Sequence, residues 1–423
     1  MYDKHFAGSC GFSFTRETYS MSSSSSAGTE TLSLIPGLPN DLAALILTLI
    51  PFSHHTRLKC TSKSWYSFLS SSTLLPLRRV TLPTPSLSHL VCIFPQDPSL
   101  GQPYLFDPLH AAWSPLPPMP CSPHRYGLSN FASVSLGSRI FVLGGSYFDN
   151  RSFPIDRPRA SASVYALDLS TFTWSRRSPM PTPRGSFACA ADPSTSSILV
   201  AGGGSRHNLF GSGGSRISAV ERYDVVRDEW IEEEKLPRYR AGCVGFMFGE
   251  DEFWVMGGYG DCRTISGVLP VDEYYKDRAV LRLKNGKWRE FGDMWEEGER
   301  WKLGRVVAVD GLNGARPDFF MLDGDEIFRF DVSMNRWWKE STLPRRSPPD
   351  CSCGFVALGE ELYVMFVLPP SLDPGKKSRV KQKPPLFIQV YSHRKRKWRF
   401  LVTKSPFKHP LDFRTAVMCA VRL

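Results

Sequence analysis

The sequence of 423 residues predicts a mostly β protein: a six-bladed β-propeller that is closed by its C-terminal strand and preceded by a small α-helical module. The composition is the first observation behind this prediction, because 33 Gly and 34 Pro indicate many turns, while 28 Phe and 11 Trp can fill a large core. The second observation is a repeat marked by six regularly placed tryptophans. Both favour many short strands over a helical solenoid or a coiled coil.

Residues 1–31 form an N-terminal tail that includes the run Ser22–Ser26 and few large apolar side chains. Such a segment cannot bury enough surface to offset the entropy lost on ordering, so we expect it to be disordered. A transit peptide is an alternative for a Ser-rich tail, but Asp3, Glu17 and Glu30 count against it.

The segment 32–78 predicts a helical module of two or three short helices. Pro39 suits a first helical turn, and Pro51 ends the helix that follows. Between them, four side chains at positions i, i+3, i+4 and i+7 form one apolar face: Leu42, Leu45, Ile46 and Leu49. A second helical stretch carries Leu58 and Trp65. A unit of this size buries little surface alone, so its apolar face is suited to another protein.

This module resembles the F-box, whose pattern begins Leu-Pro-x-Asp/Glu-Leu and ends near Cys-Lys-x-Trp. The matching stretches are Leu38–Leu42, Ile46–Leu47, Pro51 and Lys59–Trp65, although here the lysine follows the cysteine by three positions. The resemblance implies binding to an SKP-type adaptor of a cullin–RING ubiquitin ligase. The residues implied are Leu38, Pro39, Leu42, Ile46, Leu49, Pro51, Leu58 and Trp65. The alternative is an ordinary helical cap on the larger domain.

The repeat is anchored by tryptophans spaced 61, 56, 58, 49 and 61 residues apart: Trp113, Trp174, Trp230, Trp288, Trp337 and Trp398. An Asp lies six residues before four of them, and a Pro behind an apolar residue lies seven residues after the same four. Before each Trp, alternating apolar runs predict strands, and three of these runs end in a glycine pair, at 144–145, 202–203 and 257–258. We therefore expect four antiparallel strands per repeat, with a structural Trp between neighbouring blades.

The glycine pair, the distal aromatic residue and the Trp resemble the kelch repeat, which implies that residues 85–423 form a kelch β-propeller. The expected blades are 85–120, 125–181, 184–237, 240–295, 303–344 and 351–406. The first repeat lacks its innermost strand, and the chain ends with one unpaired strand. We expect residues 413–423 to complete the first blade and close the ring, which leaves no exposed sheet edge there.

One face of the propeller is predicted to bind a partner. Long insertions follow the second strand of four repeats, at 146–161, 204–218, 259–274 and 369–385, and they emerge with the segments that connect the blades. Repeated Arg and Tyr side chains there suit a protein hot spot or an acidic ligand. Each Arg could instead bind strand carbonyls or neighbouring acids. The candidates for this face are Arg125, Arg184, Arg206, Arg238, Tyr239, Arg240, Tyr259, Arg305 and Arg345.

The net charge of +11 comes from one segment, because residues 376–408 hold 12 Lys or Arg and no acid, while the rest of the chain sums to −1. This segment could be a solvated turn, a patch for nuclear import or an acidic partner, or a nucleic-acid contact. Proteins that follow a phosphate backbone usually carry a broad basic stripe, so nucleic acid is not an expected partner.

No catalytic or cofactor motif is present: the sequence has no phosphate-binding loop, no HExxH, no GxSxG and no CxxC pair. We therefore expect a protein without metal or cofactor. The ten scattered cysteines suggest free thiols in a reducing compartment. No signal peptide is evident, and the longest apolar run, 42–52, is too short to cross a bilayer. The expectation is a protein of the cytoplasm or nucleus that does not bind membranes.

The order of these parts resembles the F-box/kelch-repeat proteins, a family common in plants. The resemblance implies a non-catalytic substrate receptor of an SKP–cullin–F-box ubiquitin ligase, in which the helical module holds the adaptor and the propeller holds a target protein. Two other classes stay open: a propeller scaffold that is not coupled to a ligase, and a propeller metal oxidase. The sequence does not identify the target.

Overall fold

The computed structural model of the chain describes residues 33–82, 87–95, 102–120, 126–149, 159–204, 215–265, 269–296, 298, 302–311, 316–348, 352–368, 385–407 and 411–423. The expected N-terminal tail, residues 1–31, and the basic residues 376–383 lie outside this set.

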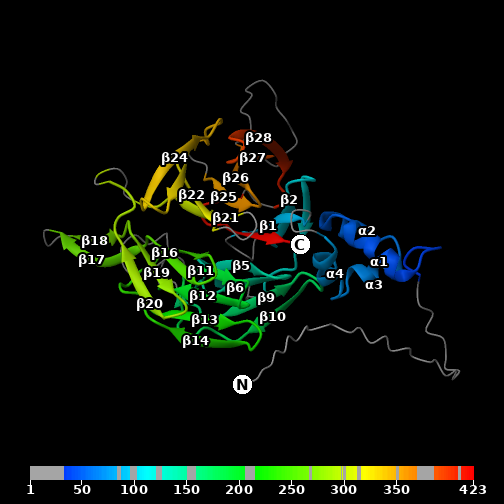
Figure 1. The fold of residues 1–423 in the computed structure, drawn as a ribbon, viewed down its shortest axis with the longest axis horizontal. Coiled ribbons are helices and arrows are strands. Elements are labelled where there is room, and N and C mark those ends of the chain that lie inside the picture. The colour runs from blue at the N-terminus through cyan, green and yellow to red at the C-terminus, as the bar shows by residue number, and fades with distance from the viewer. Residues whose placement is uncertain are drawn as a thin grey trace, which may run out of the picture.

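The N-terminal module contains helix α1 (Asn40–Leu49), the 3-10 turn η1 (Phe52–His54) and helices α2 (His55–Leu58), α3 (Lys63–Leu69) and α4 (Leu74–Thr81), which lie at one side of the molecule (Figure 1). The second helical stretch expected from sequence is divided into α2 and α3. The division has a local cause: the Ser62 hydroxyl accepts the Trp65 backbone N–H at 3.1 Å, which caps α3 and starts a new helix.

Six four-stranded antiparallel sheets form the blades and surround one axis, which confirms the predicted six-bladed propeller (Figure 1). Each blade is given from its innermost to its outermost strand. Blade 1 is β29 (Val417–Arg422), β1 (His89–Phe94), β2 (Tyr104–Asp107) and β3 (Ala112–Pro115); blade 2 is β5 (Ala132–Leu136), β6 (Arg139–Leu143), β9 (Val164–Asp168) and β10 (Thr173–Arg177); blade 3 is β11 (Ala188–Asp192), β12 (Ser197–Ala201), β13 (Val220–Asp224) and β14 (Glu229–Glu233). Blade 4 is β15 (Val244–Phe248), β16 (Glu252–Met256), β19 (Arg278–Arg282) and β20 (Lys287–Phe291); blade 5 is β21 (Arg305–Val309), β22 (Asp318–Asp323), β23 (Glu326–Asp331) and β24 (Arg336–Thr342); blade 6 is β25 (Gly354–Leu358), β26 (Glu361–Val367), β27 (Pro385–Ser392) and β28 (Lys397–Lys404).

The C-terminal strand closes the ring, as the sequence predicts. Strand β29 pairs antiparallel with β1 over six residue pairs, from His89 opposite Arg422 to Phe94 opposite Val417. Beyond the strand, Leu423 exchanges two backbone hydrogen bonds with Ser88, at 2.7 and 3.0 Å. The last residues of the chain therefore complete the first blade.

Each of the six tryptophans lies on the outermost strand of its blade, and five of them donate the indole N–H to the preceding blade or to the segment that leaves it. The acceptors are Thr403 for Trp113, Pro117 for Trp174, Ser178 for Trp230, Glu234 for Trp288 and Ser341 for Trp398, at 2.7–3.2 Å. Trp337 differs, because its buried indole N–H has no acceptor among the described residues, while its backbone N–H donates to the Met294 carbonyl. These contacts link consecutive blades around the ring.

The glycine pairs end β6, β12 and β16, where the backbone turns under the segment that leads to the next blade. All six glycines have positive φ, between 61° and 104°. A Cβ at Gly202 would lie 2.7 Å from the carbonyl oxygen of Arg240, and one at Gly144 would collide with the carbonyl oxygen of Arg184. Glycine is thus required for both the conformation and the close approach.

In the described parts of the four long insertions, those at 146–161 and 259–274 contain strands. Strands β7 (Ser146–Asp149) and β8 (Arg159–Ala160) join β4 (Tyr126–Ser129) in a small sheet. Strands β17 (Tyr259–Ile265) and β18 (Leu269–Tyr274) form a hairpin that projects beyond the rim (Figure 1). The hairpin sequence carries Thr264, Ile265 and Val271, and such β-branched residues favour strands.

Candidate protein-binding surfaces

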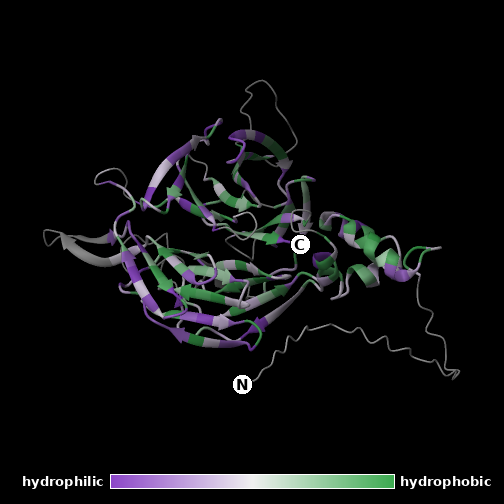
Figure 2. Cartoon of the chain, in the orientation of Figure 1, coloured by the Kyte–Doolittle hydropathy of each residue, from purple (hydrophilic) through white to green (hydrophobic). Residues whose placement is uncertain are grey.

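Helix α1 is rich in apolar residues, which Figure 2 shows as a green stretch of the N-terminal module, and it presents an apolar face to solvent. Leu42, Leu45, Ile46 and Leu49 are 40–60% exposed, whereas Ala43 and Leu47, on the opposite side of the helix, are fully buried. The helix packs through that buried side against α4. Several large apolar side chains gathered on one exposed face are typical of an interaction site.

The other predicted adaptor-binding residues are divided between surface and interior. Leu38 and Pro39 are exposed next to α1, whereas Pro51, Leu58 and Trp65 are half-buried. Trp65 has an internal contact, since its indole N–H donates to the Leu34 carbonyl at 2.6 Å and holds the start of the module against α3. Sequence reasoning missed Tyr66, which is more than half exposed beside Trp65.

The module is fixed to the propeller on a side that leaves the apolar face of α1 free. Phe52 is buried and stacks on Phe172 of blade 2, with the ring centroids 6.2 Å apart. The Lys59 ammonium lies 4.9 Å from the centre of the same Phe172 ring. Arg78 is buried, donates to the Thr48 and Ile50 carbonyls at the C-terminal end of α1, and donates to the Ser88 hydroxyl at 3.1 Å. A cation at this end of a helix is favourable.

Buried His55 lies at the same junction and donates its Nε2–H to the Ile50 carbonyl at 3.0 Å. Burial lowers its pKa to about 4 despite this hydrogen bond, and the positive charges of Arg78 and Lys59 act in the same direction as burial. The ring is therefore neutral in the folded protein at neutral pH.

We expect the module to lose stability in mild acid because of His55. The unfolded chain, with a His pKa near 6.5, takes up the proton first, so the free energy of unfolding falls between about pH 6.5 and pH 4, by about 3 kcal/mol in total. Melting followed across this range should show the loss in the wild type and a smaller loss in His55→Gln. Equal slopes in the two proteins would contradict this account.

On the propeller, two arginines predicted to lie on the binding face are fully buried, so that prediction is wrong for them. Arg184 donates to the carbonyls of Gly202 and Ala219 at 3.0 and 2.9 Å and forms an ion pair with Glu221 at 2.8 Å. The Arg240 guanidinium binds both carboxylate oxygens of Asp277, at 2.6 and 3.1 Å. Each chain segment that carries one of these arginines runs inward above a glycine pair, so the side chain binds strand carbonyls and a neighbouring acid.

Arg305 and Arg238 also have partners inside the protein. Arg305 is partly buried and donates to the Phe413 carbonyl, which ties blade 5 to the C-terminal segment. Arg238 is partly exposed, contacts Asp277 and Glu290, and lies with its guanidinium 4.4 Å from the centre of the Tyr275 ring.

The remaining candidates leave a smaller patch around the root of the β17–β18 hairpin. Tyr239 is more than half exposed, and Tyr259 lies with its ring 5.0 Å from the Lys302 ammonium, a residue that sequence reasoning missed. Arg238, beside Tyr239 in the sequence, contributes a guanidinium that is already paired with Asp277 and Glu290. Arg345 lies elsewhere, in the segment between β24 and β25, and is exposed, with its guanidinium 4.8 Å from the centre of the Phe387 ring of blade 6.

Other parts of the sequence-based prediction fall on residues that the structure describes only in part. Arg125 and Arg206 lie outside the described residues. In the basic segment, Arg394 lies in the turn between β27 and β28 and pairs with Glu360 at 3.2 Å. Within the described ranges, no three His, Cys, Asp or Glu side chains are placed to hold a metal ion. In the same ranges, no helix has the length and apolar character needed to cross a bilayer.

Comparison with known proteins gives matches in both parts of the chain. The model of the F-box domain matches residues 35–77, and the model of the kelch motif matches residues 127–181. The F-box/kelch-repeat protein OR23 of Arabidopsis thaliana is 54% identical over 410 residues, which cover 93% of this chain and 92% of the relative. The F-box protein AFR of the same plant is 29% identical over 290 residues, which cover 67% and 68% of the two chains. A solved structure titled "Structure of YjhT" is 14% identical, with a TM-score of 0.43 over 69% of this chain and 86% of that one.

Proposed function

Since the chain belongs to the F-box/kelch-repeat proteins, we propose that it is the substrate-recognition subunit of an SKP–cullin–F-box E3 ubiquitin ligase. In this proposal the helical module binds an SKP-type adaptor, and through it a cullin–RING ligase, while the propeller binds a target protein. The observation that carries the proposal is the exposed apolar face of α1 on a module whose opposite side is docked on the propeller. Such a receptor works in the cytoplasm or nucleus.

The proposed role is positional and involves no chemistry on this chain. A bound target is held close to a ubiquitin-conjugating enzyme, so that ubiquitin transfer occurs at a high effective concentration of target lysines. Burying one exposed Leu side chain in a protein interface can contribute about 1.5–3 kcal/mol. Each α1 leucine that an adaptor covers would therefore add to the binding free energy, in proportion to the apolar area that is now exposed.

The two surfaces lie at different ends of the propeller. Arg79 of α4 lies beside Gly137 and near Gly359, in the turns between first and second strands. The glycine pairs, Tyr239 and Tyr259 lie at the opposite end, where second strands finish. An adaptor on α1 would leave this second surface free for a target. The exposed Tyr, Arg and Lys side chains there suit acidic or aromatic groups of a target protein.

The proposal is tested by co-purification of the full chain with an SKP-type adaptor. We expect the double substitution Leu45→Ala/Leu49→Ala to weaken adaptor binding about 100-fold, because two apolar anchors are truncated. The melting temperature should fall only slightly, since Leu49 is 60% and Leu45 is 40% exposed and neither belongs to the buried side of α1.

A control removes two apolar side chains from the propeller that are at least as exposed, Val226→Ala/Val402→Ala, and should leave adaptor binding unchanged. Adaptor binding that survives the α1 substitutions would reject the ligase assignment and leave a propeller scaffold. A purified protein that contains stoichiometric metal would instead favour the oxidase.

A further inference from the structure

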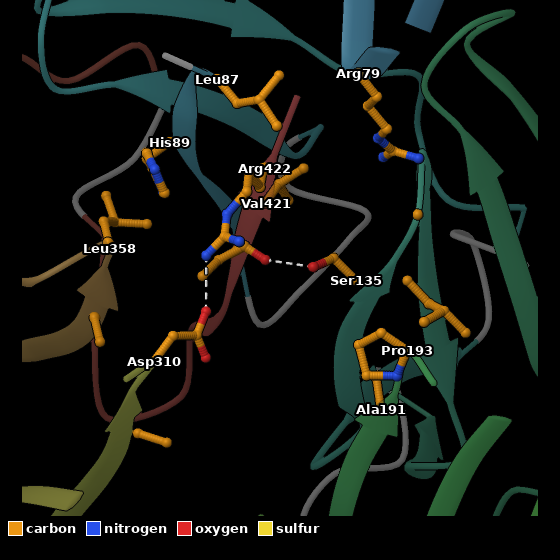
Figure 3. A pocket seen from close by; sticks show the side chains of 16 residues that line it. Arg79, Leu87, His89, Ser135, Ala191, Pro193, Asp310, Leu358, Val421 and Arg422 are labelled. Carbon is orange, nitrogen blue, oxygen red and sulfur yellow. Dashed lines mark hydrogen bonds and ion pairs between the residues drawn. The ribbon is translucent and has the colours of Figure 1, made fainter. Parts of the chain in front are cut away.

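The propeller axis ends in a cavity of about 390 Å³ on the side of helix α4 (Figure 3). The ends of the innermost strands β5, β11, β21, β25 and β29 surround it, and α4 contributes Arg79. This volume lies within the range of small-molecule sites in proteins. Neither the adaptor face of α1 nor the patch around Tyr239 includes it.

Arg79 faces this cavity with an uncompensated charge. Its guanidinium is half-buried beside the Gly137 turn, and it makes no hydrogen bond or ion pair with any described residue. Burial lowers the pKa of Arg79, which shows that the charge is disfavoured at this place. Arginine nevertheless stays protonated, so an anion in the cavity would relieve the cost of this unpaired cation.

A second guanidinium reaches the cavity from β29. Arg422 pairs with Asp310 at 2.7 Å, and His89 lies on the same side (Figure 3). Asp310 is the one carboxylate in the lining, against the two arginines, so the described walls carry a net positive charge. A cavity lined by one sign of charge concentrates ligands of the other sign.

The rest of the lining is mixed. Leu87 and Leu136 are half-buried beside the cavity, whereas Leu358 and Val421 are almost fully buried and leave mainly strand-end backbone at the wall, together with Ser135 and small side chains such as Ala191. A ligand that fits this lining has one anionic group and a compact body with both apolar and hydrogen-bonding atoms.

We propose that this cavity binds a small organic anion, whose carboxylate or phosphate group pairs with Arg79, while Arg422 on another wall adds to the positive potential. The planar, forked guanidinium matches both anionic groups. Bound there, the ligand would bridge α4 to the inner strands and stabilise the folded chain by mass action. This proposal goes beyond the ligase role and does not depend on adaptor binding.

Two substitutions should change anion binding in opposite directions. Arg79→Gln removes the free guanidinium and should weaken binding at least tenfold. Asp310→Asn removes the acid that occupies Arg422 and should strengthen binding severalfold. A residue with a merely structural role would not produce such opposite effects.

The experiment measures melting and calorimetric titration of the full chain with two probes, inorganic phosphate and benzoate, at ionic strength matched with chloride. We expect a saturable rise in melting temperature with at least one probe, and that probe identifies the anionic group. Arg57→Gln, at an exposed position on α2 outside the cavity, should bind like the wild type. Without a probe, Arg79→Gln should melt no lower than the wild type, because an unpaired charge is removed. Equal binding by the wild type and Arg79→Gln, or no binding of either probe even by Asp310→Asn, would overturn the proposal.

Discussion

Deletion of residues 413–423 is expected to leave the chain insoluble, or to lower its melting temperature by at least about 10 °C. The deletion removes β29, which supplies the innermost strand of blade 1. It also removes the buried side chains of Phe413, Val421 and Leu423. Each of these contributes about 1.5–3 kcal/mol by burial.

The deletion also exposes a sheet edge that the intact protein covers. Without β29, the edge of β1 that faces it would offer unpaired N–H and C=O groups, while the other edge stays paired with β2, and the side chains from Leu90 to Phe94 would lose part of their cover. An apolar edge of this kind pairs readily with other chains. Aggregation is therefore the expected outcome during expression, and sedimentation of the lysate measures it.

Two single substitutions on β29 separate loss of packing from a change of sequence at the C-terminus. Val421 is buried between blades 1 and 2, whereas Ala420, the next residue along the same strand, is exposed. Val421→Ser should lower the free energy of unfolding by about 2 kcal/mol, and Ala420→Ser should change it by less than about 0.5 kcal/mol. Unchanged melting after the deletion itself would contradict the closure.

Asp277→Ala is expected to lower the free energy of unfolding by about 3–5 kcal/mol. The substitution leaves the Arg240 guanidinium fully buried with one carbonyl acceptor, that of Gly257 at 3.2 Å, and without its counterion. Arg238 loses the same partner. The expected loss is large because the cost of desolvating Arg240 is no longer offset.

The control is an ion pair of the same kind at the surface. Arg329 and Asp318 lie 2.9 Å apart and are both more than a third exposed. Asp318→Ala should therefore cost less than about 1 kcal/mol. Chemical denaturation of the two variants measures both losses, and similar values for Asp277→Ala and Asp318→Ala would show that burial adds nothing to the Arg240 pair.

Much of the architecture could be predicted from sequence because each repeat reuses the same physical solution. An indole on the outermost strand links one blade to the preceding blade, and a glycine pair lets the next segment pass close to the backbone. The first contact requires Trp and the second requires Gly, so these residues recur in the sequence at regular spacing. The exposed side of α1 was predictable for the same reason, since four apolar side chains at helical spacing must share a face.

The roles of the individual arginines could not be predicted from composition. Arg238 and Arg240 are two residues apart, yet one is partly exposed and the other is buried, because the backbone turns inward between them. A usable signal was present, since Glu221 follows Arg184 by 37 residues and Asp277 follows Arg240 by the same distance. Acids at a fixed offset from repeated arginines indicate internal ion pairs. No comparable sequence pattern identifies Lys302. Its closeness to Tyr259 depends on how the β17–β18 hairpin and the segment between β20 and β21 fold.

Because β1 is made early and β29 is made last, the first blade of the newly synthesised protein can be completed only at the end of translation. The ribosome must add 322 residues between the end of β1, at Phe94, and the start of β29, at Val417. At about 5–20 residues per second, the first blade waits roughly 16–65 s for its missing strand. During this interval the edge of β1 that later pairs with β29 is uncovered in the nascent propeller. Chaperones that cover apolar strands are therefore most needed then.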